Sequence, residues 1–322
     1  MILVCGEALI DLFVGQPTPK GLPTEAVAGG SPFNVAIGLA RLQCPTAFLS
    51  TLSDDAFGSF LAERLSVSGV RTDYLHRCPL RSTLSVVATG ADGHPHYSFY
   101  AEAGADRALT VDRLPSALPH EINAIAAGSY ALGVEPVATA IETLLRRETG
   151  KRVISLDPNV RPRVLGDLQS FRDRWQRLLA TATIVKASAE DIEHLYGTQD
   201  VVSVAREWLE RGPSLVVMTR GADGPLAVTR TGTLIERPAQ PVSVVDTVGA
   251  GDSFHAALLA HLDAEHLLTP DRIARLTPTQ VSSALDFAVA AAAVTCTRRG
   301  ANPPAWAEVV ANVSKHSPLN AT

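Results

Sequence analysis

The chain has 322 residues, of which 46% are hydrophobic and 19% are charged, a balance typical of a folded protein and not of a disordered one. Its formal net charge of −5 argues against a general nucleic-acid binder, which would present a basic face. The four cysteines are scattered and form no Cys-x-x-Cys pair, which predicts reduced thiols and no zinc site. The chain does not open like a leader peptide, and its longest apolar stretch is 287–294, so we expect a cytoplasmic protein without membrane contact.

Short β-branched runs alternate with longer helical patterns along most of the chain. We predict strands, in chain order, at 1–5, 46–52, 124–127, 153–156, 183–185 and 215–218. A helix is expected to begin at Ser31, with the serine as its N-cap and Pro32 as its first residue. Further helices are expected at 56–66, 136–147 and 167–179. This order predicts an α/β protein with a mostly parallel sheet covered by helices on both faces.

Two regions break this alternation. Residues 83–89 and 96–100 alternate in polarity around Ala91-Asp92-Gly93, which is typical of a hairpin. Residues 12–28 are also non-helical and rich in proline and glycine. We expect both regions to pair as a small antiparallel sheet that projects from the main domain. The last third contains hairpin-like residues at 224–242, followed by helices at 252–263, 278–297 and 304–315.

The segment 242–260 holds the clearest sign of chemistry. An apolar strand is expected to end at Val245, followed by a Gly-Ala-Gly turn and a helix that begins at about Asp252. Glycines allow close approach of a ligand, and the first amides of a helix attract an anion. Asp252 would lie where a phosphate binds, so it could take a proton from an attacking hydroxyl. The alternative is that Asp252 only caps the helix.

Two common nucleotide-binding motifs are missing from the sequence. There is no GxxxxGK[ST] loop, and no GxGxxG follows a predicted strand. Only four lysines occur, and none lies in a glycine-rich loop. These observations argue against P-loop nucleotidases and against dinucleotide-dependent oxidoreductases.

Two longer runs resemble the signatures of one family. The run DTVGAGDSF (246–254) resembles the C-terminal signature of the ribokinase-like (PfkB-type) carbohydrate kinases, and AGGSPFNVA (28–36) with LARL (39–42) resembles their N-terminal signature. The resemblance extends from Gly6 to Ala301. It implies an ATP-dependent sugar kinase with a three-layer αβα ribokinase-like fold. Residues 1–11, 31–82 and 108–322 would form the large domain, and 12–30 and 83–107 the small β lid.

The resemblance also implies how the reaction is catalysed. Asp252 would be the general base, and the amides of Gly249, Ala250 and Gly251 would form an anion hole for the transferred phosphoryl group. Mg²⁺ and backbone amides would then neutralise the phosphate charge, which explains how so few lysines suffice.

Several residues would bind the sugar if the resemblance holds. They are Asp11, the amides of Gly29 and Gly30, Asn34, Phe99, Arg107, and Arg161 of the run DPNVR (157–161). Each has a simpler alternative where the residue alone is considered: Asp11 as an exposed strand-end charge, Asn34 as a polar residue of a first helical turn, and Arg161 as the ion-pair partner of Asp157.

The nucleotide and ion sites are also carried over from the family. The loop TRGADG (219–224), with Thr219, Gly221 and Gly224, would cover the ATP phosphates and ribose, although a glycine-rich hairpin turn is the alternative. Lys186 and Ser188 would border the nucleotide. Here the family's Asn and Glu are replaced by Ser188 and Asp191, so Mg²⁺ would be held through water by Asp191, with Glu190 as the competitor. Asp246 and the carbonyl of Val248, with carbonyls near 296–300, would hold K⁺.

The motifs look most like those of fructokinases. The opening GEALIDLF (6–13) and DPNVR support this, and the reaction expected is ATP plus D-fructose to fructose 6-phosphate and ADP. Relatives that phosphorylate 2-keto-3-deoxygluconate often carry an arginine where this chain has Ala101, although Arg107 could replace it. Within the family, the alternatives are a kinase for ketodeoxygluconate, for another ketose or for ribose. From other classes, they are a non-catalytic regulator that binds sugar or nucleotide, and a dinucleotide-dependent oxidoreductase. A homodimer through the lid is expected from its exposed edges.

Overall fold

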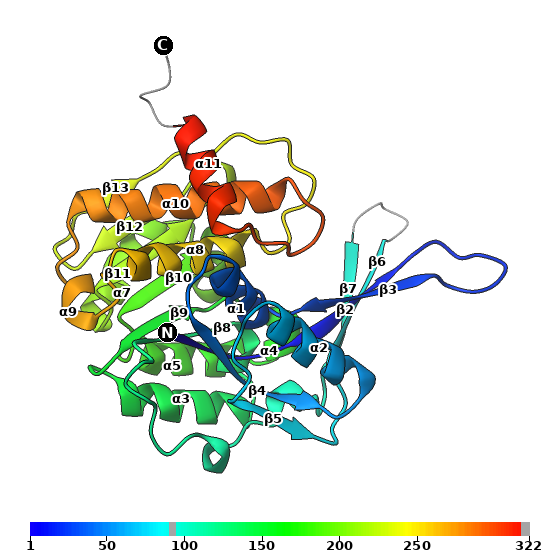
Figure 1. Cartoon of the computed structure of the whole chain (residues 1–322). Coiled ribbons are helices and arrows are strands. Elements are labelled where there is room, and N and C mark those ends of the chain that lie inside the picture. The colour runs from blue at the N-terminus through cyan, green and yellow to red at the C-terminus, as the bar shows by residue number, and fades with distance from the viewer. Residues whose placement is uncertain (90–94, 317–322) are drawn as a thin grey trace.

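The computed structural model describes residues 1–89 and 95–316, and its largest element is a nine-stranded sheet between two layers of helices (Figure 1). The strand order is β13-β12-β11-β10-β9-β8-β1-β4-β5. The strands are β1 (Ile2–Cys5), β4 (Thr46–Ser53), β5 (Leu75–Cys78), β8 (Ala124–Gly128), β9 (Val153–Asp157), β10 (Ile184–Ser188), β11 (Leu215–Thr219), β12 (Leu226–Thr229) and β13 (Leu234–Glu236). From β11 to β5 every neighbour is parallel, while β12 and β13 pair antiparallel. The predicted mostly parallel sheet is confirmed.

The helices divide between the two faces of this sheet, and each layer has its own apolar core. One core unites the sheet with α1 (Ser31–Arg41), α2 (Ala56–Val67), α8 (Ala250–Ala264) and α10 (Pro278–Cys296). The other unites it with α3 (Val137–Glu148), α5 (Leu168–Leu179), α6 (Ala189–Tyr196) and α7 (Val201–Arg211). The remaining helices are α4 (Pro162–Leu165), α9 (Pro270–Ile273), α11 (Trp306–His316) and the short 3-10 turns η1 (Ala105–Arg107), η2 (Val111–Arg113), η3 (Ser129–Leu132) and η4 (Gly221–Asp223).

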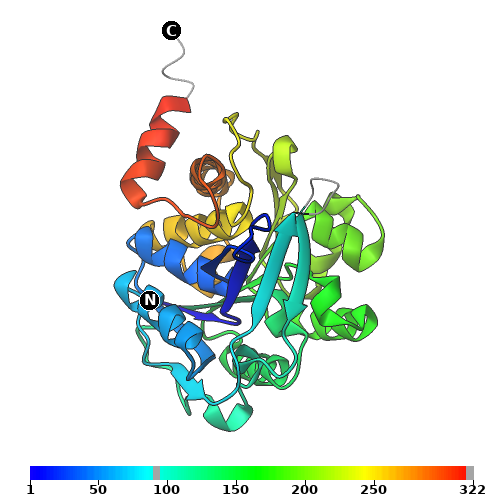
Figure 2. The ribbon, with the colours of Figure 1, turned by 90° about the vertical axis from the view of Figure 1, so that its right-hand side faces the viewer.

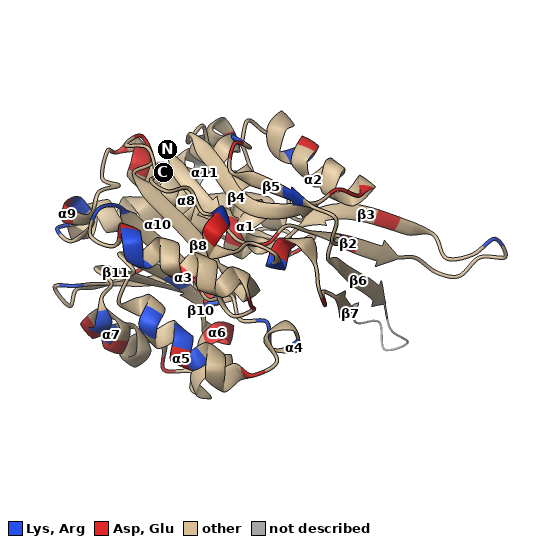
Figure 3. Cartoon of the chain, turned by 90° about the horizontal axis from the view of Figure 1, so that it is seen from below, with Lys and Arg blue, Asp and Glu red and all other residues tan. Residues whose placement is uncertain are grey.

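One described helix, α10, is long and apolar enough, by length and composition alone, to cross a membrane. Half of it is buried inside the fold, where it packs against α8 and α11, as the core helix of a folded domain does. Seen from below, α5 and α7 each carry both acidic and basic residues (Figure 3).

A second, four-stranded sheet projects beside the large one (Figures 1 and 2). Its order is β3-β2-β6-β7, from β2 (Leu9–Val14), β3 (Thr24–Gly29), β6 (Leu84–Thr89) and β7 (Pro95–Tyr100). The hairpins β2–β3 and β6–β7 are antiparallel, but β2 and β6 pair parallel, so the prediction of a wholly antiparallel sheet is wrong. The turn at Ala91–Gly93, like His94, lies outside the described residues. We call this sheet the lid; the exact division of the chain into domains stays a prediction.

The segment before the glycine turn differs from the prediction. Residues 237–249 contain no strand, and Val244 and Val245 are 60% and 63% exposed. The backbone N–H groups of Val245 and Asp246 donate to the carbonyl of Cys296, so this segment is a loop held to the end of α10. Helix α8 begins at Ala250, earlier than expected.

Local patterns also missed some elements and one cap. Strand β5 and helices α6, α7 and α9 were not expected. The N-cap of α1 is Gly30 (φ 106°), and no side chain caps this helix. Ser31 is free for another role because its hydroxyl is directed at a carboxylate from a distant helix.

Candidate active site

The glycine turn before α8 has a geometry that strongly favours glycine. Gly249 is the N-cap of α8 with φ 76°, and an added Cβ would lie 2.7 Å from the Cβ and 2.8 Å from the Cα of Ala301. The amide of Ala250 donates back to the carbonyl of Thr247, so this amide is used within the turn. The first-turn amides of Gly251 and Asp252 lie at the start of α8, where a helix favours anions.

The carboxylate of Asp252 is held by two side chains of α1. Oδ1 accepts a hydrogen bond from Ser31 Oγ at 2.7 Å, and Oδ2 accepts one from Asn34 Nδ2 at 2.8 Å. Burial raises the pKa of Asp252, while these two hydrogen bonds and the charge of Lys186 act in the opposite direction. Since Gly249 is the cap and no side chain caps α8, the alternative that Asp252 caps its helix is wrong. Asn34 also has a specific partner, Asp252, so it is more than a polar residue of a first helical turn.

Asp11 lies within lid strand β2. Its carboxylate packs so closely on Gly29 that a Cβ there would lie 2.2 Å from Asp11 Oδ2. Burial raises the pKa of Asp11; a hydrogen bond from Ser85 lowers it and the charge of Asp252 raises it further. In the pairing of the lid strands, Asp11 of β2 lies opposite Ser85 of β6, and Ser85 lies opposite Phe99 of β7. These three residues therefore form one row across the lid sheet. The structure therefore gathers Asp11, Gly29, Asn34 and Asp252, and Asp11 is not an exposed strand-end charge.

The two candidate arginines differ in their surroundings. The Arg107 guanidinium lies over the Tyr130 ring, 5.7 Å from its centroid, and its buried Nε has no hydrogen-bond partner among the described residues. Arg161 is exposed and donates to its neighbouring carbonyl at Val160. Asp157 pairs with Lys186 at 2.8 Å, so the alternative of an Arg161–Asp157 ion pair is wrong.

A buried polar chain lies beneath the start of α8. Lys186 Nζ contacts Asp157 Oδ2 at 2.8 Å, and an added Cβ on Gly251 would lie 3.2 Å from the same ammonium. Burial alone would lower the pKa of Lys186, but the charges of Asp157, Asp191 and Asp252 raise it overall. The ammonium is therefore a fixed positive charge directly behind the glycine turn.

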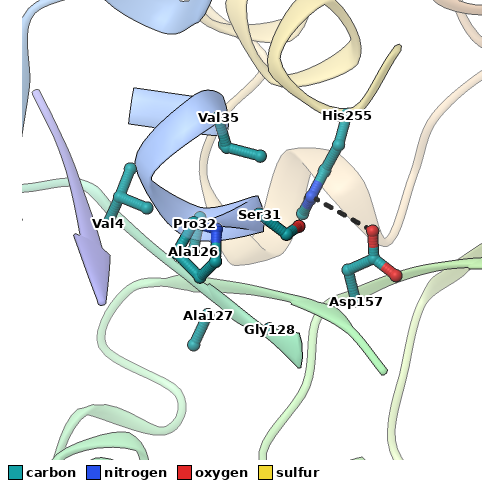
Figure 4. A pocket seen from close by; sticks show the side chains of 9 residues that line it. All are labelled: Val4, Ser31, Pro32, Val35, Ala126, Ala127, Gly128, Asp157 and His255. Carbon is teal, nitrogen blue, oxygen red and sulfur yellow. Dashed lines mark ion pairs between the residues drawn. The ribbon is translucent and has the colours of Figure 1, made fainter. Parts of the chain in front are cut away.

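His255 extends this chain, and no sequence motif pointed to it. Its Nε2 lies 2.7 Å from Ser155 Oγ, and its Nδ1 lies 4.0 Å from Asp157 Oδ2. Burial, with the nearby Lys186 charge, lowers the pKa of His255 to about 3, so the ring is neutral. Figure 4 shows His255, Asp157 and Ser31 around a cavity of about 10 Å³, close to the size of one water molecule.

The predicted nucleotide loop follows β11. Thr219 ends that strand, and its hydroxyl donates to the carbonyl of Ala187. Gly221 and Gly224 have φ values of 54° and 75°, and a Cβ on Gly224 would lie 2.1 Å from the Arg237 carbonyl. The loop joins the antiparallel strands β11 and β12, so it is a glycine-rich hairpin connection at the carboxyl end of β11.

The predicted magnesium ligands are engaged in protein hydrogen bonds. Ser188 caps α6, and Asp191 completes its capping box. Asp191 Oδ1 accepts from the amide of Val160 at 2.7 Å, and Oδ2 accepts from the amide and hydroxyl of Ser188. Such a carboxylate suits a metal-bound water better than direct coordination, whereas Glu190 is exposed. Within residues 1–89 and 95–316, no three His, Cys, Asp or Glu side chains are grouped for a metal.

The two halves of the predicted K⁺ site lie together. Asp246 Oδ1 accepts from the amide of Val248 at 3.0 Å, and Oδ2 accepts from the amide of Gly300 at 2.8 Å. The loop that contains Asp246 is therefore tied to the segment after α10, directly behind the glycine turn.

Comparisons with known proteins agree on one family. Residues 1–308 match the family described as pfkB family carbohydrate kinase. The chain is 41% identical to a fructokinase of Rhizobium leguminosarum bv. trifolii over 276 residues, 86% of this chain and 84% of that protein. It is 35% identical to a fructokinase of Klebsiella pneumoniae over 288 residues, 86% of this chain and 88% of that protein.

Solved structures show the same fold. Fructokinase of Xylella fastidiosa with bound ATP superposes with a TM-score of 0.89 at 30% identity, with 98% of each chain covered. A double mutant of Vibrio cholerae fructokinase with bound fructose, ADP and potassium superposes with a TM-score of 0.82 at 27% identity, with 97% of each chain covered.

Proposed function

The chain belongs to the pfkB family of carbohydrate kinases, and we propose that it transfers the terminal phosphoryl group of ATP to D-fructose, giving fructose 6-phosphate and ADP. The observation that carries this proposal is the buried Asp252 carboxylate at the start of α8, held by Ser31 and Asn34 beside first-turn amides. A base adjacent to an anion site is the arrangement that phosphoryl transfer to a hydroxyl requires. We choose fructose as the sugar because these relatives are named fructokinases.

Asp252 acts as the general base in the proposed reaction. It removes the proton of the 6-hydroxyl as that oxygen attacks the terminal phosphorus of ATP, and the bond from phosphorus to the ADP oxygen breaks. The amides of Gly249, Ala250 and Gly251 were the expected anion hole. Because the Ala250 amide donates within the turn, the Gly249 and Gly251 amides carry more of this role.

The sugar lies between the lid and the start of α1 in this proposal. Asp11 accepts sugar hydroxyls, the amides of Gly29 and Gly30 and the side chain of Asn34 add polar contacts, and Phe99 covers the sugar from the lid. Arg107 and Arg161 supply positive charge at the edge of the site. Closure of the lid over the sugar would exclude water and suppress wasteful hydrolysis of ATP.

ATP would extend along the carboxyl ends of β10 and β11, bordered by Lys186, Ser188, Thr219, Gly221 and Gly224. When bound, Mg²⁺ neutralises phosphate charge, and Asp191 or Glu190 would hold its water molecules. K⁺ would be held by Asp246 and the Val248 carbonyl, where it would steady the glycine turn. Free cysteines are compatible with the cytoplasm, where we place the protein.

The test is ADP release with Mg-ATP across fructose, ribose, tagatose, 2-keto-3-deoxygluconate and adenosine. We expect the highest kcat/KM with fructose. If kcat/KM is highest with ketodeoxygluconate, tagatose or ribose, that compound and not fructose is the substrate. ADP release with none of them would favour the non-catalytic regulator. The family membership offers no support for a dinucleotide-dependent oxidoreductase.

A further inference from the structure

A second pocket adjoins the site described above. It has a volume of about 160 Å³ and is formed by lid strand β3, helices α1 and α2 and the segment 301–303. Phe33 and Ile37 of α1 and Phe60 of α2 make its apolar wall. Arg41 and Arg64, from the last turns of α1 and α2, also line it. The pocket therefore combines an apolar interior with two guanidinium groups.

These two arginines lie in a locally basic group, in which Arg41, Arg64 and Arg298 outnumber the one nearby carboxylate, Glu308. Arg41 Nη1 donates to the side-chain oxygen of Asn302 at 2.6 Å and to the carbonyl of Pro303 at 2.7 Å, and both acceptors are neutral. Among the residues that the structure describes, no carboxylate forms an ion pair with Arg41 or Arg64. Burial lowers the pKa of Arg41, and the like charges of Arg64 and Arg298 lower it further, while the Glu308 carboxylate, which pairs with Arg298, raises it. Because an arginine stays protonated, the pocket holds an excess of positive charge.

We propose that this pocket binds a small organic anion, in which a carboxylate or phosphate group pairs with Arg41 and Arg64 and an apolar body fills the space between β3, α1 and α2. Guanidinium groups bind both anions through charge-assisted hydrogen bonds. A cavity of about 150 Å³ accommodates a molecule of the size of benzene, which sets the scale of the apolar body.

The pocket adjoins the proposed sugar site at Asn34 and extends away from it along α1. Asn34, which donates to Asp252, borders one end of the pocket, and Arg41 lies two helical turns further along α1. At 1.5 Å per residue this places the anionic end of the ligand roughly 10 Å from Asn34 along the helix. A ligand here touches both the lid strand β3 and the helix that holds the base. It would therefore change the affinity for sugar, provided that sugar binding moves the lid.

Binding is tested by calorimetry with benzoate, phenyl phosphate and inorganic phosphate, in the presence of saturating ADP so that the nucleotide site is filled. We expect benzoate and phenyl phosphate to bind, and phenyl phosphate to bind more tightly than inorganic phosphate because only it fills the apolar space. Failure of both aromatic anions to bind, or tighter binding of inorganic phosphate, would overturn the proposal. These measurements do not depend on turnover, so they stand even if fructose is not the substrate.

Arg64 offers the sharpest variant because it is exposed and has no part in the proposed catalysis. Arg64→Gln should weaken binding of both aromatic anions by about tenfold or more, since a charge-assisted contact is lost. Arg206→Gln, at another exposed arginine on α7, is the matched control and should bind as the unaltered protein does. Equal affinities in Arg64→Gln and the control would contradict the assignment. Phe60→Ala should reduce the preference for phenyl phosphate over inorganic phosphate.

Discussion

Asp252 is placed for chemistry by contacts that come from a different part of the chain. Asp252→Asn keeps a side chain of the same shape but removes the base, so we expect kcat to fall by on the order of 10²–10⁴-fold while the fold is retained. Steady-state kinetics and circular dichroism measure the two effects. Near-normal turnover of a folded variant would remove Asp252 from the role of base.

The buried pair of Lys186 and Asp157 should matter for stability as well. Lys186→Met leaves the Asp157 carboxylate buried without its cation, and we expect a loss of about 3–5 kcal/mol in the free energy of unfolding. Urea denaturation measures this loss. The double variant Lys186→Met/Asp157→Asn should recover part of it, because no uncompensated charge remains. A double variant less stable than Lys186→Met would argue against this account.

Glu7 provides a pH-dependent contribution to stability. Burial raises the pKa of Glu7 from 4.5 to about 8, so the folded protein keeps its proton where the unfolded chain has lost it. The contribution is complete below about 4.5 and is lost as the pH rises through about 8. Between these two pH values, Glu7 should make the free energy of unfolding of the unaltered protein fall by about 1.4 kcal/mol per pH unit. Glu7→Gln should abolish this part of the fall. Identical slopes in the two proteins would contradict this expectation.

At the scale of elements, the start of α8 depends on Gly249. Gly249→Ala forces a side chain into the left-handed region and against Ala301, so the helix start must shift, and we expect kcat to fall by about 10²-fold or more. Gly197→Ala is the matched control, since Gly197 has φ 66° but an added Cβ meets nothing within 4 Å. That control should cost about 1–2 kcal/mol of stability and leave kcat unchanged. Equal kinetics in the two variants would show that the clash is unimportant.

Much of the element order could be predicted because it depends on local pattern. The six predicted strands of the large sheet and the start of α1 follow from apolar runs and from Pro32 after Ser31. Val244 and Val245 mimic a strand end, but both are exposed in a loop that the Val245 amide ties to the carbonyl of Cys296, and no local pattern contains this long-range hydrogen bond. The parallel pairing of β2 with β6 is equally non-local.

The candidate site shows the same limit. Asp252 and Asn34 were predicted through family signatures, and the structure joins them. Neither the Lys186–Asp157 pair nor the burial of His255 could be predicted, because each depends on how neighbouring parallel strands and α8 meet in space. Asp157, the alternative partner considered for Arg161, is paired with Lys186 instead.

At the scale of the whole molecule, the lid sheet has two open edges, β3 and β7. Open edges are commonly covered by another chain, so we propose that two copies associate through their lids. Light scattering at micromolar concentration should give the mass of a dimer, and dilution should shift it toward the monomer. A single species of monomer mass across that range would remove the proposal.

The way the lid is attached to the large sheet has a consequence for how such a protein can diversify. Each lid hairpin leaves the large domain after a strand of the main sheet and returns to it shortly afterwards, β2–β3 between β1 and α1, and β6–β7 between β5 and η1. Changes in the length of either hairpin are absorbed beyond the two apolar cores, where chain insertions cost little. The lid can therefore acquire new contacts for a different sugar while the base, the glycine turn and their supporting helices stay as they are.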